Sequence, residues 1–153
     1  MHFCLVDAVL EQSEDRIVTI KQVTAAEEYL QDHFPSFPVL PGVFMVESLV
    51  QAARRLLAPR GDSRLVLGGV RAMKYGSFVR PGDTLRVEVS VHKANPDGSF
   101  ELKGEGTVLG PDSNKTPASG DNKQPTAVSG RFTMRPLALE PVRAAVVAAT
   151  ASA

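Results

Sequence analysis

The stretch GVFMVESLVQAARRLL, residues 42–57, decides the fold because its apolar residues recur at helical spacing. Along such a helix they form two neighbouring rows, one of Val43, Val46, Val50, Ala53 and Leu57 and one of Met45, Leu49, Ala52 and Leu56. The first three turns are apolar on nearly every side. This pattern predicts a helix buried inside the protein rather than one lying on its surface.

Outside this helix the sequence alternates between apolar and polar residues, which is typical of half-buried strands. In residues 84–93, for example, Leu85, Val87, Val89 and Val91 would face one way and Arg86, Glu88, Ser90 and His92 the other. The pattern predicts strands over residues 84–93, 99–109 and 127–135, with weaker signals over 3–9, 16–23 and 65–75. The turn Asn95–Gly98 would join two of them as a hairpin, and the pair Gly68-Gly69 predicts a bulge. We therefore expect an α+β fold in which an antiparallel sheet of about six strands wraps around one long buried helix.

Two further predictions concern the outer parts of the chain. A short helix is expected over residues 25–30, with Thr24 as its N-cap and Glu27 in the capping-box position. Residues 111–126 contain one aliphatic residue, Ala118, and we interpret them as a flexible inserted loop. Residues 1–136 would then form a single domain followed by a C-terminal tail, residues 137–153.

Composition excludes several classes of protein. The chain has 153 residues, and its 17 basic and 17 acidic side chains leave no formal net charge. With that balance and no Trp, it lacks the features of a general nucleic-acid binder. The single cysteine, Cys4, excludes an internal disulfide and a multi-cysteine metal site. No apolar run is long enough to span a membrane and no secretory signal is evident, so we expect a cytoplasmic protein.

The segment that leads into the long helix, residues 32–42, holds the first candidate site residues. Prolines at positions 35, 38 and 41 make it a stiff, extended loop that holds His33 in a defined place. His33 titrates near neutral pH and can act as a base. At the helix start, the backbone N–H groups of Gly42 and Val43 could bind a carbonyl oxygen that becomes negative during a reaction.

Glu47 is a carboxylate inside the apolar run of the helix. Burial there should raise its pKa and make it a proton donor near neutral pH. A base, exposed amides and a protonatable acid together suit proton abstraction beside a carbonyl, followed by protonation of a leaving group. Simpler interpretations remain open: His33 could be a loop residue bound to backbone, and Glu47 a structural partner of Arg54 or Arg55.

Residues 33–51, HFPSFPVLPGVFMVESLVQ, resemble the signature of the 3-hydroxyacyl-acyl-carrier-protein dehydratases of type II fatty acid synthesis. The resemblance is to the Z-type enzymes, which have Glu on the helix where A-type enzymes have Asp. Leu5-Val6-Asp7, Lys74-Tyr75 and Pro81-Gly82-Asp83 also match.

This resemblance implies the hot-dog fold and a homodimer with active sites at the interface, often assembled further into hexamers. It implies that His33 takes the C2 proton or works with the acid, and that Glu47 of the other subunit helps to expel the C3 hydroxyl. The amide of Gly42 or Val43 would polarise the thioester carbonyl. The resemblance also implies that no metal or redox cofactor takes part and that the acyl group arrives on the phosphopantetheine arm of acyl carrier protein. To the substrate tunnel we assign Phe37, Pro41, Phe44 and Phe78.

Charge gives a separate indication of an acidic partner. Between Arg54 and Arg80 there are seven basic residues and one acidic residue. Such segregation could steer the acidic carrier protein towards the active site. The docking residues we predict are Arg54, Arg55, Lys74 and Arg80.

The sequence thus predicts a lyase that dehydrates (3R)-3-hydroxyacyl-acyl-carrier-protein to the trans-2-enoyl form in fatty acid biosynthesis, with His33 and Glu47 as acid and base. Two alternatives stay open. One is a hot-dog acyl thioesterase, and the other is a non-catalytic protein that binds acyl carrier protein.

Overall fold

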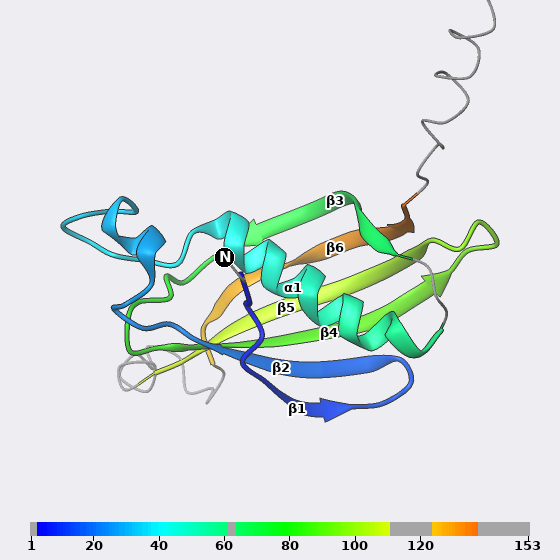
Figure 1. Ribbon diagram of the computed structural model, residues 1–153, viewed down its shortest axis with the longest axis horizontal. Coiled ribbons are helices and arrows are strands. Elements are labelled where there is room, and N and C mark those ends of the chain that lie inside the picture. Colours follow the sequence, from blue (N-terminus) through cyan, green and yellow to red (C-terminus); the bar gives the residue numbers. More distant parts are fainter. Residues whose placement is uncertain (1–2, 61–63, 111–123, 138–153) are drawn as a thin grey trace, which may run out of the picture.

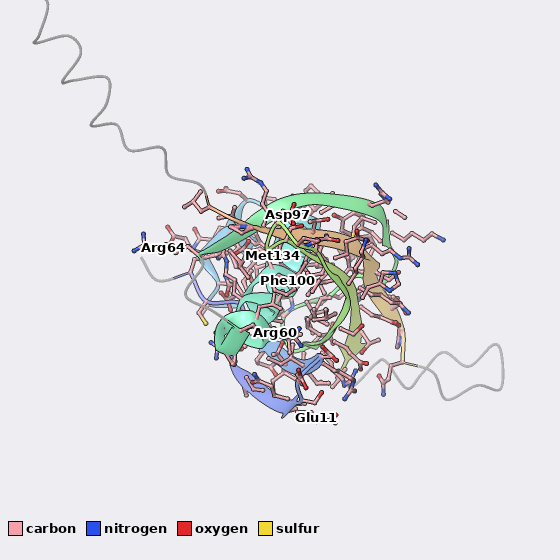
Figure 2. All side chains as sticks on the ribbon, turned by 90° about the vertical axis from the view of Figure 1, so that its right-hand side faces the viewer. Glu11, Arg60, Arg64, Asp97, Phe100 and Met134 are labelled. Atoms are coloured by element: carbon pink, nitrogen blue, oxygen red, sulfur yellow. The ribbon has the colours of Figure 1, made fainter. Side chains whose placement is uncertain are left out.

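One antiparallel sheet contains all six strands of the residues that the computed structural model describes, which are 3–60, 64–110 and 124–137. The strands are β1 (Ala8–Gln12), β2 (Arg16–Gln22), β3 (Leu65–Tyr75), β4 (Thr84–Ala94), β5 (Phe100–Leu109) and β6 (Thr126–Pro136). Their order across the sheet is β1-β2-β4-β5-β6-β3, so β1 and β3 form its edges. The helix α1 (Gly42–Leu57) lies along one face (Figure 1), and the sheet curves around it in the end-on view of Figure 2.

The core lies between α1 and the concave face of the sheet. Leu49 of α1 and Leu85, Val87 and Val89 of β4 are fully buried there. Gly104 of β5 lets the helix come close, because a Cβ there would lie 2.7 Å from Leu49 Cδ2. At the far end of the helix, Arg60 of the short helix η2 (Ala58–Arg60) lies over the ring of Phe100 at 6.0 Å (Figure 2).

The long helix, the hairpin and the bulge are confirmed. The helix has the bounds predicted for it, and the turn at Asn95–Gly98 is closed by a hydrogen bond from the Asn95 amide to the Ser99 carbonyl. Gly98 has a positive φ of 78°, which glycine adopts without strain. The register of β3 against β6 shifts between Leu67 and Gly69, as a bulge requires.

The first strand was misplaced, because β1 begins at Ala8 rather than at Phe3. Leu5 and Val6 are both buried, which a strand with one exposed face does not allow for neighbouring residues. The Leu5 amide donates a hydrogen bond to Gln51 of α1, so this segment is held by the helix. Its apolar residues pack into the core without pairing in the sheet.

The short helix before α1 is also different from the prediction. It is the 3-10 turn η1 (Glu28–Gln31), and no side chain caps it. The carboxylate of Glu27 binds Lys21 Nζ at 2.8 Å, so it is not available for a capping box at Thr24. The buried Lys21 on β2 is thus the partner that Glu27 has in place of Thr24.

The first turns of α1 are less buried than predicted. Val43 is 69% exposed and Phe44 and Val46 are half-buried, because one side of the helix start faces away from the sheet.

The predicted loop over residues 111–126 and tail over 137–153 fall mostly outside the described residues; Thr126 already belongs to β6. Within the described ranges, no helix is long and apolar enough to cross a membrane.

Candidate active site

His33 lies in the loop between η1 and α1, where it is bound to Val39. His33 Nδ1 lies 3.1 Å from the Val39 carbonyl oxygen, and the Val39 amide donates a hydrogen bond to the His33 carbonyl. Because a carbonyl can only accept, Nδ1 carries the proton in this contact. The neutral ring then keeps its lone pair on Nε2, the form needed in a base. The ring also stacks on Phe34, with 4.4 Å between centroids.

The start of α1 presents two amides that no described residue binds. The amides of Phe44 and Met45 both donate to the Pro41 carbonyl, at 2.9 and 3.1 Å. Those of Gly42 and Val43 precede them and have no side-chain cap. Free amides at the positive end of a helix dipole are suited to hold a developing oxyanion.

Tyr75 is a neighbour of this helix start to which we had assigned no role. A Cβ built on Gly42 would lie 2.9 Å from Tyr75 Cε1. The ring of this last residue of β3 is 55% exposed. The Lys74-Tyr75 pair matches the family. The contact of Tyr75 with Gly42, however, depends on the path of β3, so no pattern in the neighbouring sequence predicts it.

Glu47 is not buried as predicted, since 35% of its side chain is exposed. It faces the side of α1 that the sheet leaves uncovered, where Gln51 Nε2 donates a 3.1 Å hydrogen bond to its Oε1. Arg54 Nη1 lies 3.7 Å from the same oxygen, so the partnership with Arg54 that we considered does occur. No hydrogen bond or ion pair between His33 and Glu47 occurs within this one described chain.

Gln51 was not among the predicted site residues. Its amide oxygen accepts from the Leu5 amide, and its nitrogen donates to Glu47 and to the Phe3 carbonyl. Gln51 thus fixes Glu47 against the N-terminal segment. The four-residue spacing between Glu47 and Gln51 was a usable signal for this contact.

The residues assigned to the substrate tunnel lie in two groups. Phe37 and Phe78 form an edge-to-face pair at 5.5 Å, and the Arg80 guanidinium lies 4.8 Å from the Phe37 ring centroid. Phe44 instead contacts Phe3 and Tyr29, each at 4.8 Å between centroids. Pro41 is buried at the start of α1.

The four predicted docking residues are also divided. Arg80 and Lys74 lie close to the two ends of the β3–β4 connection, near the start of α1 where Tyr75 meets Gly42. Arg54 and Arg55 are on the last turns of α1, about 18 Å further along the helix axis. They bind backbone oxygens there, of Leu65 and Val6 respectively. A single chain therefore does not gather these four cations into one patch.

Comparison with known proteins places this chain in a family. The sequence model of the ApeI-like family, described as ApeI dehydratase, matches residues 9–111, which is more than half of the chain. The chain belongs to the ApeI-like dehydratase family.

Named relatives of this ApeI-like chain are 3-hydroxyacyl-[acyl-carrier-protein] dehydratases called FabZ. The protein from Pseudothermotoga lettingae is 45% identical over 86 residues, which cover 56% of this chain and 61% of that relative. The chain thus spans less than two thirds of that relative's length. The FabZ of Lactococcus lactis subsp. cremoris is 46% identical over 116 residues, which cover 67% of this chain and 81% of that relative. The FabZ of Ruminiclostridium cellulolyticum is 38% identical over 118 residues, which cover 67% of this chain and 83% of that relative.

Solved structures confirm the hot-dog fold of this ApeI-like protein. The dehydratase heterocomplex ApeI:P from Xenorhabdus doucetiae superposes with a TM-score of 0.62 at 18% identity, covering 85% of this chain and 96% of that one. A point mutant of the fluoroacetyl-CoA-specific thioesterase FlK superposes with a TM-score of 0.60 at 16% identity, covering 87% of this chain and 93% of that one. Because a dehydratase and a thioesterase share this fold, the fold itself does not identify the reaction.

Proposed function

We propose that this protein dehydrates (3R)-3-hydroxyacyl groups on acyl carrier protein to trans-2-enoyl groups in fatty acid biosynthesis. The FabZ relatives carry the name of this activity. Glu at position 47 agrees with the Z-type enzymes. The observation that carries the proposal is the His33 ring, whose Nδ1 contact with Val39 leaves Nε2 to act as a base, in the loop that leads into the open amides of α1.

The reaction begins at the C2 carbon of the substrate. Nε2 of His33 takes a proton from C2, and negative charge develops on the thioester carbonyl oxygen. The amides of Gly42 and Val43 donate hydrogen bonds to that oxygen and stabilise the charge. Phe34 is stacked on the imidazole and holds the orientation of the His33 ring while that ring becomes charged.

The second half of the reaction is the loss of the hydroxyl group. Glu47 Oε2, to which no described side chain donates a hydrogen bond, gives its proton to the C3 oxygen. The C3–O bond breaks, the C2=C3 double bond forms and water leaves. The proton on His33 then passes to Glu47, so the enzyme returns to its starting state and the products are the enoyl thioester and water.

The active site of this proposal is completed by a second subunit. In one chain His33 and Glu47 have separate partners, and Glu47 faces the uncovered side of α1. The edge strand β3 is 11 residues long and exposes Leu67, Val70 and Tyr75. Open backbone groups and apolar side chains along an edge favour pairing with another strand. A homodimer formed along β3 would account for both the separation of His33 from Glu47 in one chain and the exposed edge of β3.

The acyl chain and its carrier approach from the side of Phe37, Phe78 and Arg80. Phe37 and Phe78 are 40% and 59% exposed, which suits them to contact the pantetheine arm or the acyl chain. Arg80 and Lys74 provide positive charge for an acidic carrier at this entrance. Arg54 and Arg55 could join them only from the other subunit of a dimer. The steps need no metal or redox cofactor, because side chains make both proton transfers.

Direct turnover tests the proposal. Purified protein is incubated with a trans-2-enoyl group on acyl carrier protein, and hydration is followed as loss of the conjugated enoyl absorbance. We expect loss with the wild type and a rate reduced by about 100-fold to 10,000-fold with His33→Ala. A thiol reagent added in parallel detects hydrolysis. Release of free thiol without hydration would establish a thioesterase instead, and tight carrier binding without either reaction would establish a non-catalytic protein.

A further inference from the structure

A pocket opens on the outer face of the sheet, away from α1. It has a volume of about 190 Å³ and lies between β3, β4, β5 and β6. On β6, Arg131 and Thr133 flank the buried Phe132, so they point to the outer face. The polar side chains that line it are Arg71, His92, Glu101, Arg131 and Thr133.

This pocket is separate from the candidate active site. Its residues on β4 and β5 lie near the hairpin that joins the two strands. The segment that carries His33 lies at the opposite end of the sheet (Figure 1). A ligand in the pocket would therefore not take part in the dehydration.

Three cations lie opposite one another across neighbouring strands, and two of them, Arg71 and Arg131, line this pocket. The register places Arg71 of β3 opposite Arg131 of β6, and Arg131 opposite Lys103 of β5. All three are exposed, and no carboxylate of a described residue lies within ion-pair distance of them. Like charges directly opposite in a sheet destabilise it. An anion bound in the pocket between Arg71 and Arg131 would reduce that repulsion.

Two carboxylates lie beside this row without neutralising it. Glu101 is paired in register with Thr133, and Glu105 with Ser129, so they flank the Arg131–Lys103 pair on either side. Glu105 accepts a hydrogen bond from Thr126, whereas Glu101 lines the pocket itself. Glu101 should therefore weaken the binding of any anion.

We propose that this pocket binds a phosphate-type oxyanion. Planar guanidinium groups such as those of Arg71 and Arg131 bind phosphate through two hydrogen bonds each, and the Thr133 hydroxyl can add one more. The volume corresponds to about six water molecules, enough for one phosphate group and a few atoms attached to it. Both inorganic phosphate and the phosphate of a small ester fit this description.

Four substitutions on the outer face separate this site from general surface charge. Arg131→Gln removes the central cation. Gly69→Leu places a side chain in the pocket that Gly69 lines, and a Cβ at Gly69 meets no atom within 4 Å, so the substitution can start from the present backbone. Glu101→Gln removes the opposing charge. Arg135→Gln is the matched control, because Arg135 is an exposed arginine on the same strand and face that does not line the pocket.

The experiment is calorimetric titration of the full-length chain with inorganic phosphate at constant ionic strength, with chloride as the balancing salt. We expect Arg131→Gln to weaken binding about tenfold or more, Gly69→Leu to abolish it, and Glu101→Gln to tighten it. Arg135→Gln should stay within about twofold of the wild type. Size measurement of each variant confirms that the oligomeric state is unchanged.

Methyl phosphate identifies the source of the anion. If it binds more tightly than inorganic phosphate, the pocket receives a phosphate ester, and if it binds less tightly, the pocket receives free phosphate. Absence of binding for both probes would overturn the proposal. An equal loss of affinity in Arg131→Gln and Arg135→Gln would overturn it too, since it would show that general surface charge attracts the anion.

Discussion

The ring of Tyr75 lies against the backbone of Gly42, so that a Cβ on Gly42 would be 2.9 Å from Tyr75 Cε1. Gly42 is the first residue of α1, and Tyr75 is the last residue of the edge strand β3. The absence of a side chain at Gly42 therefore brings an exposed aromatic ring to the two open amides of the candidate site. In the proposed reaction, access of the thioester carbonyl to these amides would depend on this contact.

Gly42→Ala should reduce dehydration about 10-fold to 100-fold while leaving the fold intact. The added methyl group displaces the Tyr75 ring or the helix start, and small displacements of a catalytic group reduce rates to this extent. Stability should change by less than about 1 kcal/mol, because alanine is a good helix former and an exposed ring can rotate away. Enoyl hydration rates and a thermal melt measure the two effects.

The double variant separates the contact from other effects of the substitution. If the clash with Tyr75 is the cause, adding Gly42→Ala to Tyr75→Ala should cost less activity than it does in the wild type. Full activity of the single Gly42→Ala variant would show that the contact has no part in the reaction.

Mixed dimers test whether His33 and Glu47 of one site come from different subunits. His33→Ala and Glu47→Gln should each be inactive alone. When the two are co-expressed, half of the dimers contain one chain of each kind, and one of their two sites has both residues intact. Activity should then return to about a quarter of the wild-type value. No recovery in verified mixed dimers would place both residues in the same subunit's site.

The helix and most strands could be predicted from the sequence because their signals are local. The apolar rows of residues 42–57 and the alternation in β4 fix which side of each element faces the core. The same reasoning failed for Leu5 and Val6. Their apolar character predicts that they are buried, but it does not show whether they lie in a strand of the sheet or are held against the helix.

The candidate site was harder to predict from the sequence because its contacts join distant parts of the chain. His33 is bound by the carbonyl of Val39, and every residue type offers such a group. The apolar neighbours of Glu47 predicted burial, but the sheet covers only one side of α1. Phe44 packs on Phe3 and Tyr29, a contact that depends on the path of two irregular segments.

Gly104→Ala should destabilise the protein by about 1–3 kcal/mol. Its Cβ would lie 2.7 Å from Leu49 Cδ2 and 3.1 Å from Phe132 Cε1, both in the buried core. Neither side chain can move into solvent, unlike Tyr75 beside Gly42. Urea unfolding of the variant measures the loss.

Leu49→Ala provides the companion variant for Gly104→Ala. Alone it should cost about 2–5 kcal/mol through the cavity that it leaves. Together the two should cost less than the sum of the single effects, because the new methyl group occupies part of that cavity. Additive effects would show that the close approach of Leu49 to Gly104 does not limit the packing.

Glu88→Gln should show how an ion pair on the outer face makes stability depend on pH. Arg16 binds both oxygens of Glu88, at 2.8 and 3.0 Å, and this hydrogen-bonded contact lowers the pKa of the carboxyl. The folded state therefore holds the Glu88 proton less tightly than the unfolded state does. The resulting stabilisation is present above the ordinary pKa of Glu and is lost as pH falls through the lowered folded value.

At pH 7 the Glu88→Gln variant should be less stable by about 0.5–1 kcal/mol, a small value because more than a third of each side chain is exposed and solvent screens the pair. The difference should hold down to about pH 5 and close towards about pH 3, as Glu88 of the wild type becomes protonated. Urea unfolding at both ends of this range measures it. Glu14→Gln, at an exposed carboxylate with no ion-pair partner among the described residues, should show no such gap. A Glu88→Gln deficit that is undiminished at pH 3 would mean that the carboxylate charge is not its cause.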